Sequence, residues 1–184
     1  PVVTKKIRED DDQDKVGNQG WNDLADFEIG QTVPYRYESN MPDVNGYNTY
    51  YYAWHDVMSE ALTFKKDSVA IRIYESSNAR NYYELKEGEF EVKEAPGGGD
   101  TFQVVVSDMK KIIDREFNRK NEAGENKYGQ KIVLTYQATL NEKAAKNTGR
   151  PGFENDVRLE FSNDPDSAVR GSTGYTPWDT VVCF

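Results

Sequence analysis

Apolar and polar residues alternate along most of the chain, and a period of two is typical of strands with one buried face. β-branched and aromatic residues fill most of the apolar positions, and turn-forming stretches such as Asn45-Gly46 and 96–100 separate the runs. We therefore predict an all-β protein. Its strands are expected at 2–8, 29–39, 48–57, 67–74, 81–92, 101–106, 130–140, 154–163 and 179–184.

One segment, 107–119, has helical spacing instead. Its apolar residues recur three to four positions apart from Met109 to Phe117, and Ser107 or Asp108 stands where a helix N-cap is expected. This pattern predicts one short crossover helix over an end of a β-sandwich.

The polar stretch 164–178 interrupts the alternation with two prolines and two glycines. We predict one large domain over 1–168 and a linker or closing loop over 169–178. The apolar residues of 179–184 then form either a last strand or the first strand of a following domain.

Three polar residues occupy positions where the alternation calls for an apolar side chain: Lys5, Asp56 and Asn163. Because alternate residues of a strand share a face, all three side chains are expected to point into the core. An unpaired polar group there costs about 1–3 kcal/mol, so the amine, carboxyl and carboxamide are expected to satisfy one another. Asn155 shares the inward phase of Asn163 and is the second candidate for the carboxamide. The alternative is an edge lysine and two turn residues, since Asn-Asp-Pro at 163–165 is a good turn sequence.

The charge, the apolar runs and the cysteine content of the chain indicate which partners and which crosslinks to expect. The 184 residues include 23 basic and 32 acidic side chains, for a net charge of -9, which argues against nucleic acid as a partner. No apolar run approaches a membrane span, and no signal-peptide pattern follows Pro1. We therefore expect an excised piece without membrane contact, whose targeting information lies outside it. Cys183 is the only cysteine, so no internal disulfide can form.

Other candidate sites are weaker. His55, the only histidine, adjoins Asp56, but strand neighbours face opposite ways, which excludes a direct dyad and favours a surface histidine. The glycines at 97–99 lack a phosphate-binding signature and are expected in a hairpin or loop. The aromatic run 47–54 could stack on sugars or bases, although packing within the sheet is favoured. The acidic run 8–14 lacks the central glycine and late glutamate of a calcium loop, which favours a solvated loop and no metal.

Five segments together resemble one protein family. They are VVTKK at 2–6, IGQTVPY at 29–35, DVMSEALTF at 56–64, IVLTYQATL at 132–140 and VRLEFSNDP at 157–165. Their order and spacing resemble the isopeptide-forming fimbrial shaft domain, of the CnaA-type immunoglobulin-like fold, that is the second domain of sortase-assembled major pilins of Gram-positive bacteria. One departure lies at 59–61, where Ser-Glu-Ala stands in place of the family's proline-containing turn and glycine.

The resemblance implies a β-sandwich and a spontaneous isopeptide bond within it. By motif, Lys5 is the amine, Asn163 the acceptor with Asn155 as second choice, and Asp56 the acid that promotes the reaction. Burial favours a neutral, nucleophilic lysine beside a protonated acid, which suits this chemistry. The reaction is self-directed and single-turnover, so the resemblance implies neither an enzyme acting on external substrates nor a cofactor.

The implied function is that of a structural shaft domain of an extracellular, cell-wall-anchored pilus. Its partners are other pilin subunits, joined through a sortase-made linkage outside this segment, because neither a Tyr-Pro-Lys pilin motif nor a Leu-Pro-x-Thr-Gly sorting signal occurs here. The alternative is a host-binding module of a surface adhesin with the same fold, which would contact a host protein or glycan through 47–54 or 75–100. A sugar-active enzyme with paired carboxylates is less favoured, because no acid pair stands out by position.

Overall fold

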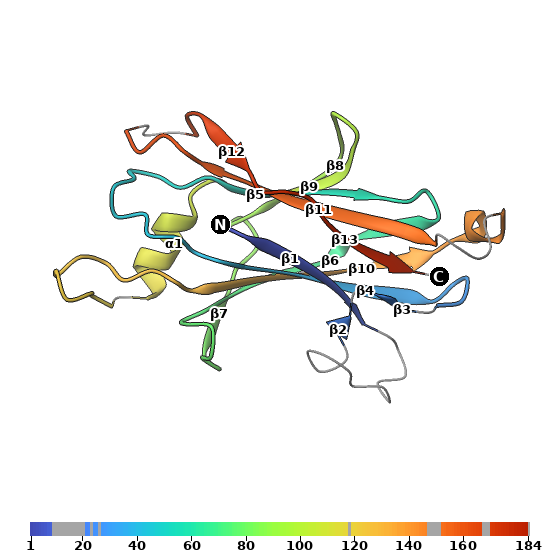
Figure 1. Cartoon of the computed structure of the whole chain (residues 1–184), viewed down its shortest axis with the longest axis horizontal. Coiled ribbons are helices and arrows are strands. Elements are labelled where there is room, and N and C mark those ends of the chain that lie inside the picture. Colours follow the sequence, from blue (N-terminus) through green and yellow to red (C-terminus); the bar gives the residue numbers. More distant parts are fainter. Residues whose placement is uncertain are drawn as a thin grey trace.

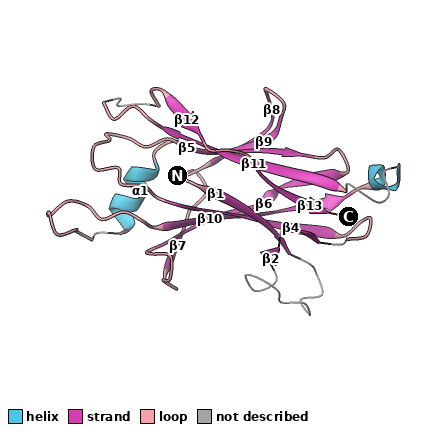
Figure 2. Ribbon diagram, viewed as in Figure 1, coloured by secondary structure: helices cyan, strands magenta, loops and turns pink. Residues whose placement is uncertain are grey.

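Two sheets face each other in a sandwich, with the helical segments at its ends (Figures 1 and 2). The computed structural model describes residues 1–8, 21–22, 24–25, 27–117, 119–146, 152–166 and 170–183. Within these residues, strands dominate as the period-two pattern predicts.

The first sheet is antiparallel throughout its described pairs. Its strand order is β2 (Trp21–Asn22), β1 (Val3–Arg8), β4 (Thr32–Asn40), β10 (Lys131–Leu140), β6 (Leu62–Tyr74) and β7 (Tyr82–Glu84). The two longest pairings, of β10 with β4 and with β6, form its centre and place the inward face of β10 over the middle of the core.

The second sheet is antiparallel except at one edge, where β13 and β3 run parallel. Its order is β3 (Leu24–Ala25), β13 (Asp179–Cys183), β11 (Phe153–Ser162), β5 (Tyr52–Met58), β9 (Asp100–Val106) and β8 (Glu91–Gly97), while β12 (Thr173–Tyr175) pairs with the end of β11. The pairing of β11 with both β5 and β13 brings residues 179–183 into the same sandwich.

The predicted helix is present as α1 (Met109–Glu116), which links β9 in one sheet to β10 in the other. The Asp108 side chain caps it by accepting a hydrogen bond from the Lys111 amide, at 3.2 Å. Ile112 and Ile113 are buried against the open end of the sandwich. A second, 3-10 helix, η1 (Glu142–Lys146), follows β10 and was not predicted.

The core is rich in aromatic side chains from both sheets. Phe64 and Phe102 stack across it with ring centroids 3.8 Å apart, and Tyr136 meets the Phe102 ring edge-on at 4.9 Å. From the 47–54 run, Tyr52 and Trp54 are fully buried, which confirms that this segment packs within the sheet. Large rigid rings of this kind fix the space left for polar groups among them.

Two predicted strands differ from the structure. The strand expected at 81–92 is wrong, because Gly88 adopts a φ of 93° in a turn that separates β7 from β8. The strand expected at 67–74 is the second half of the longer β6, whose exposed polar residues at 65–67 hide the alternation. The stretch 164–178 holds the unpredicted β12, and β2 and β3 were also missed.

Candidate functional site

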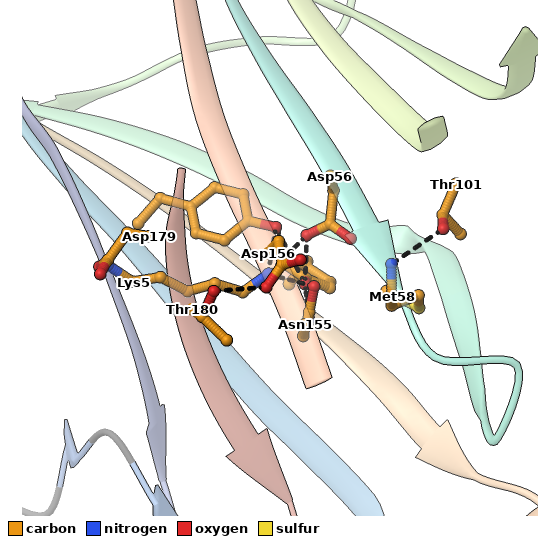
Figure 3. Close-up of polar contacts among 10 residues, drawn as sticks. Lys5, Asp56, Met58, Thr101, Asn155, Asp156, Asp179 and Thr180 are labelled. Atoms are coloured by element: carbon orange, nitrogen blue, oxygen red, sulfur yellow. Dashed lines mark hydrogen bonds and ion pairs between the residues drawn. The ribbon is translucent and has the colours of Figure 1, made fainter. Parts of the chain in front are cut away.

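Lys5 lies on β1 in the first sheet and points between the two sheets (Figure 3). Its side chain is fully buried, and Val3 and Ile7 on the same face of the strand are buried as well. Its backbone amide faces away from β4 and donates a hydrogen bond to Asp179 Oδ2, at 2.6 Å. The predicted inward orientation of Lys5 is therefore present.

Asp56 lies on β5 in the opposite sheet and is also fully buried. Its Oδ2 is 2.7 Å from Lys5 Nζ, so the amine and the acid meet across the core. Its Oδ1 has no hydrogen-bond partner among the described residues. An unpaired oxygen on a buried carboxylate is costly, so this environment shifts the carboxyl group toward its neutral form.

Asn155 on β11 completes the group, and Figure 3 shows it beside Lys5 and Asp56. It is fully buried, and its Oδ1 accepts a hydrogen bond from Lys5 Nζ. Its Nδ2 donates to the hydroxyl of Tyr136. The structure thus brings an amine, a carboxyl and a carboxamide together from three strands. Asn155, the second candidate for the carboxamide, points inward as its position in the alternation predicted.

Asn163 is not part of this group, so the first-choice carboxamide was wrong in its placement. It is exposed and follows the end of β11 at Ser162. Its side-chain Oδ1 accepts a hydrogen bond from Ser172 Oγ at 2.5 Å, and its backbone amide donates to the Ser172 carbonyl at 3.1 Å. Alternation holds only within a strand, and Asn163 lies one residue beyond it.

Two tyrosines join the site from the first sheet. Tyr37 on β4 donates its hydroxyl to Tyr136 on β10 at 2.9 Å, and it accepts from Lys5 Nζ at 3.2 Å. The Tyr136 hydroxyl in turn donates to Asp56 Oδ2 at 2.8 Å. Tyr136 lies in the strand expected at 130–140, where the alternation counts a tyrosine as apolar, so its hydroxyl was missed.

Burial moves the amine and the acid toward their neutral forms. Desolvation lowers the pKa of Lys5 to about 8, although the charge of Asp56 opposes this change. Desolvation raises the pKa of Asp56 to about 6, against the opposing effects of Lys5 and the Tyr136 hydrogen bond. The two pKa values approach each other, so proton transfer from Lys5 to Asp56 is far easier than between the same groups in water.

A family model matches the chain over residues 29–165, and it is described as Gram-positive pilin backbone subunit 2, Cna-B-like domain. The chain belongs to this family. The matched range includes Asp56, Tyr136 and Asn155, while Lys5 precedes it. The family description names a Cna-B-like domain, whereas the sequence resembles the CnaA type. Both types predict an immunoglobulin-like sandwich, and the structure has one.

Solved structures of major pilins share the fold of this pilin domain. The C-terminal fragment of GBS80 from Streptococcus agalactiae matches with a TM-score of 0.62 and 19% identity, over 99% of this chain and 55% of that one. BcpA from Bacillus cereus matches with a TM-score of 0.57 and 18% identity, over 99% and 39%. The pilus backbone protein RrgB from Streptococcus pneumoniae matches with a TM-score of 0.54 and 20% identity, over 90% of this chain and 55% of that one. The chain thus spans about half, or less, of these pilins, and no curated protein sequence matches it.

His55 of the pilin domain lies on the face of β5 opposite to Asp56 and is buried, so the expected surface histidine was wrong. Its Nδ1 is 2.5 Å from Asp100 Oδ2, and its Nε2 is 2.8 Å from Glu160 Oε1. Burial alone would lower the pKa of His55, but the hydrogen bonds to Glu160 and Asp100 raise it above the usual value. The segment after β11 covers this face, since Arg170 and Thr173 both donate to Glu160.

Within the described part of the pilin domain, no three or more His, Cys, Asp or Glu side chains are grouped as a metal site would require. The acidic run that begins at Arg8 lies, from residue 9 onward, outside the described residues. No described helix is long and apolar enough to cross a membrane.

Proposed function

We propose that Lys5 and Asn155 form an intramolecular isopeptide bond, promoted by Asp56, and that the domain is a structural element of a cell-surface pilus shaft. The observation that carries this proposal is the contact of Lys5 Nζ with both Asp56 Oδ2 and the Asn155 carboxamide, among residues that are fully buried. Membership of the pilin backbone family supports the structural role.

The chemistry begins with a neutral Lys5 amine and a protonated Asp56 carboxyl. Lys5 Nζ attacks Cγ of Asn155, and the carbonyl oxygen gains negative charge that a hydrogen bond from the acid stabilises. One proton then moves, by way of Asp56, from the attacking nitrogen to Nδ2. The bond from Cγ to Nδ2 breaks, ammonia leaves, and an amide joins the two side chains.

Folding itself supplies what an external enzyme would provide. Reacting groups held in the right orientation reach effective concentrations of about 10⁵ M or more. Lys5 and Asn155 are in contact because β1 and β11 are fixed in facing sheets around a rigid aromatic core. The reaction is therefore expected to follow folding without a cofactor.

The bond would stabilise the domain by linking parts of the chain that are far apart in sequence. Lys5 and Asn155 are separated by 150 positions. For a loop of this length, the chain-entropy model used for disulfides gives roughly 5 kcal/mol. An amide is also resistant to thiols, whereas Cys183 has no second cysteine in this chain with which to form a disulfide.

Intact-mass measurement tests the bond. The folded wild type is expected to be lighter than its sequence mass by one ammonia, and Lys5→Ala and Asn155→Ala should both have the full sequence mass. Asn163→Ala is the matched control, because it removes an exposed carboxamide eight positions away and should keep the loss. A wild type of full mass would end the proposal, and a loss that depends on Asn163 would exclude Asn155 as the acceptor.

We also propose an extracellular location at the cell wall, with other pilin subunits as partners through a sortase-made linkage outside this segment. The structural neighbours GBS80, BcpA and RrgB are described as major pilins or pilus backbone, which supports this assignment. Cell fractionation of a strain that makes the natural protein should find it in wall-linked polymers that disappear when the sortase is deleted. A protein that stays monomeric in the presence of the sortase would contradict this assignment.

The adhesin alternative rests on a smaller surface than first expected. The aromatic residues Tyr50, Tyr51, Tyr52 and Trp54 are buried, so this part of 47–54 offers no platform. In 75–100, Tyr82 is 48% exposed and remains a candidate contact. Binding to host glycans or matrix proteins that is lost in Tyr82→Ser would favour an adhesin over a shaft domain.

A further inference from the structure

The hydroxyl of Tyr136 lies at the junction of the buried polar group. It contacts Asp56 Oδ2 at 2.8 Å and Tyr37 Oη at 2.9 Å, and it accepts from Nδ2 of Asn155. Its ring is held by a stacked contact with Tyr35, with centroids 5.2 Å apart and planes inclined by 17°. A rigid, buried ring therefore fixes this hydroxyl between the acid and the carboxamide nitrogen.

The proposed bond requires a proton at that nitrogen. In a carboxamide, Nδ2 is planar and only donates hydrogen bonds. After Lys5 has attacked Cγ, Nδ2 becomes an amine with a lone pair, and it must gain a proton before it can leave as ammonia. In the described residues the hydrogen-bond partner of Asn155 Nδ2 is Tyr136, whereas Asp56 Oδ2 bonds to Lys5 and to Tyr136.

We propose that the Tyr136 hydroxyl passes a proton from Asp56 to Nδ2 of Asn155. This inference rests on the proposed function. Asp56, which is protonated at the start, gives its proton to Tyr136 Oη while the Oη–H proton moves to Nδ2, and the Asp56 carboxylate then takes the proton that the attacking Lys5 nitrogen loses. The bond from Cγ to Nδ2 then breaks. Tyr136 and Asp56 end in their starting protonation states, and the products are the amide and ammonia.

The environment of Tyr136 suits a relay rather than a separate ionisation. Burial, reinforced by the nearby charge of Asp56, holds the pKa of Tyr136 well above its usual value. The hydroxyl therefore stays protonated and can donate, and it gives up one proton only as it accepts another. The hydrogen bond between Tyr136 and Nδ2 reverses direction when attack creates the lone pair, which couples proton delivery to bond formation.

Tyr52 provides a matched control outside the site. It lies on β5 and is also fully buried, and its hydroxyl donates a hydrogen bond to Ser39 Oγ at 2.7 Å. Tyr52→Phe and Tyr136→Phe each remove one buried hydroxyl and keep the ring. Only the second removes the group that bonds to the departing nitrogen.

The test follows mass loss with time after cell-free synthesis, with the folded fraction measured in parallel. Tyr136→Phe is expected to fold and to lose ammonia about 10²-fold more slowly than the wild type, in line with general acid–base catalysis, while Tyr52→Phe stays within a few-fold. Ring-fluorinated tyrosines placed at 136 keep the hydroxyl and the packing but change its acidity. The rates of ammonia loss should vary with that acidity, and the same analogues at 52 should have little effect.

The outcomes separate this inference from the function on which it rests. A wild type of full sequence mass would overturn both. A wild type that loses ammonia, with a Tyr136→Phe variant as fast as Tyr52→Phe, would overturn the relay alone. If Tyr136→Phe fails to fold, the fluorinated tyrosines at position 136 decide the question. A rate of ammonia loss that does not change with the acidity of the hydroxyl would show that Tyr136 has only a structural role.

Discussion

Lys5 Nζ contacts Asn155 Oδ1 although the two residues are separated by 150 positions and lie on strands of opposite sheets. The same nitrogen is 2.7 Å from Asp56 Oδ2. A basic group so far from water is usually paired or neutral, and here it has both a partner and a lowered pKa. These contacts, together with those of His55 and Asp179, give four testable predictions.

The first concerns the acid. Asp56→Asn keeps the shape of the side chain and removes its acid chemistry, so the variant should have the full sequence mass. Without the crosslink its free energy of unfolding should fall by roughly 5 kcal/mol, the loop-entropy value for a closure of this length. Urea denaturation of the wild type and the variant measures the difference. A crosslinked Asp56→Asn would show that the acid is dispensable.

The second concerns the pH dependence of an uncrosslinked domain, Asn155→Ala, which retains Lys5 and Asp56. The folded pKa of Asp56 is raised from 3.8 to about 6, so the folded state holds the extra proton and stability falls as pH rises between these values. The folded pKa of Lys5 is lowered from 10.5 to about 8, so the unfolded state holds the extra proton and stability rises over that range.

The stability of Asn155→Ala should therefore pass through a minimum between about pH 6 and 8. Chemical denaturation at a series of pH values measures this curve. The control adds Lys5→Met and Asp56→Asn to the same variant, which removes both titrating groups. The minimum should be absent from that control, and a minimum of equal depth there would assign it to other residues.

The third concerns His55, whose ring bonds to Asp100 and Glu160. Its folded pKa is raised above 6.5, so its contribution to stability is complete below pH 6.5 and is lost as pH rises through the folded value. Because it is the only histidine, its NMR titration needs no assignment by mutation. Glu160→Gln should lower the measured pKa, and a wild-type value at or below 6.5 would contradict the paired geometry.

The fourth concerns Asp179, which accepts a hydrogen bond from the Lys5 amide at 2.6 Å. Asp179→Ala should destabilise the domain by about 1–3 kcal/mol, because the amide at this edge of β1 loses a charged acceptor. Asp179→Asn retains an acceptor and should recover part of the loss. The comparison is best made in the Asn155→Ala background by urea denaturation, where equal stability of all three forms would show that the contact contributes nothing.

Much of the site could be predicted from the sequence because alternation is a local property. Lys5, Asp56 and Asn155 lie within strands, and their inward phase follows from their neighbours. Asn163 has the same phase, but the strand ends at Ser162, and the pairing of β12 that shapes this end is not visible locally. Strand ends are fixed by such distant contacts.

The environment of His55 could not be predicted for a related reason. Its partners Asp100 and Glu160 lie 45 and 105 positions away, and both are brought to it only by the register of neighbouring strands. Register depends on side-chain packing over whole sheets. The hydroxyl of Tyr136 was missed because a tyrosine at an inward position satisfies the apolar pattern whether or not its oxygen is used.

The position of Lys5 near the start of β1 has a mechanical consequence. With the proposed bond in place, force applied on either side of the pair would pass from β1 to β11 through one amide, and residues 6–154 would lie off the force path. The strands and loops from β4 to η1 could then vary in sequence, or open transiently, without lengthening the fibre. Extensibility and surface variation would become independent properties of the same domain.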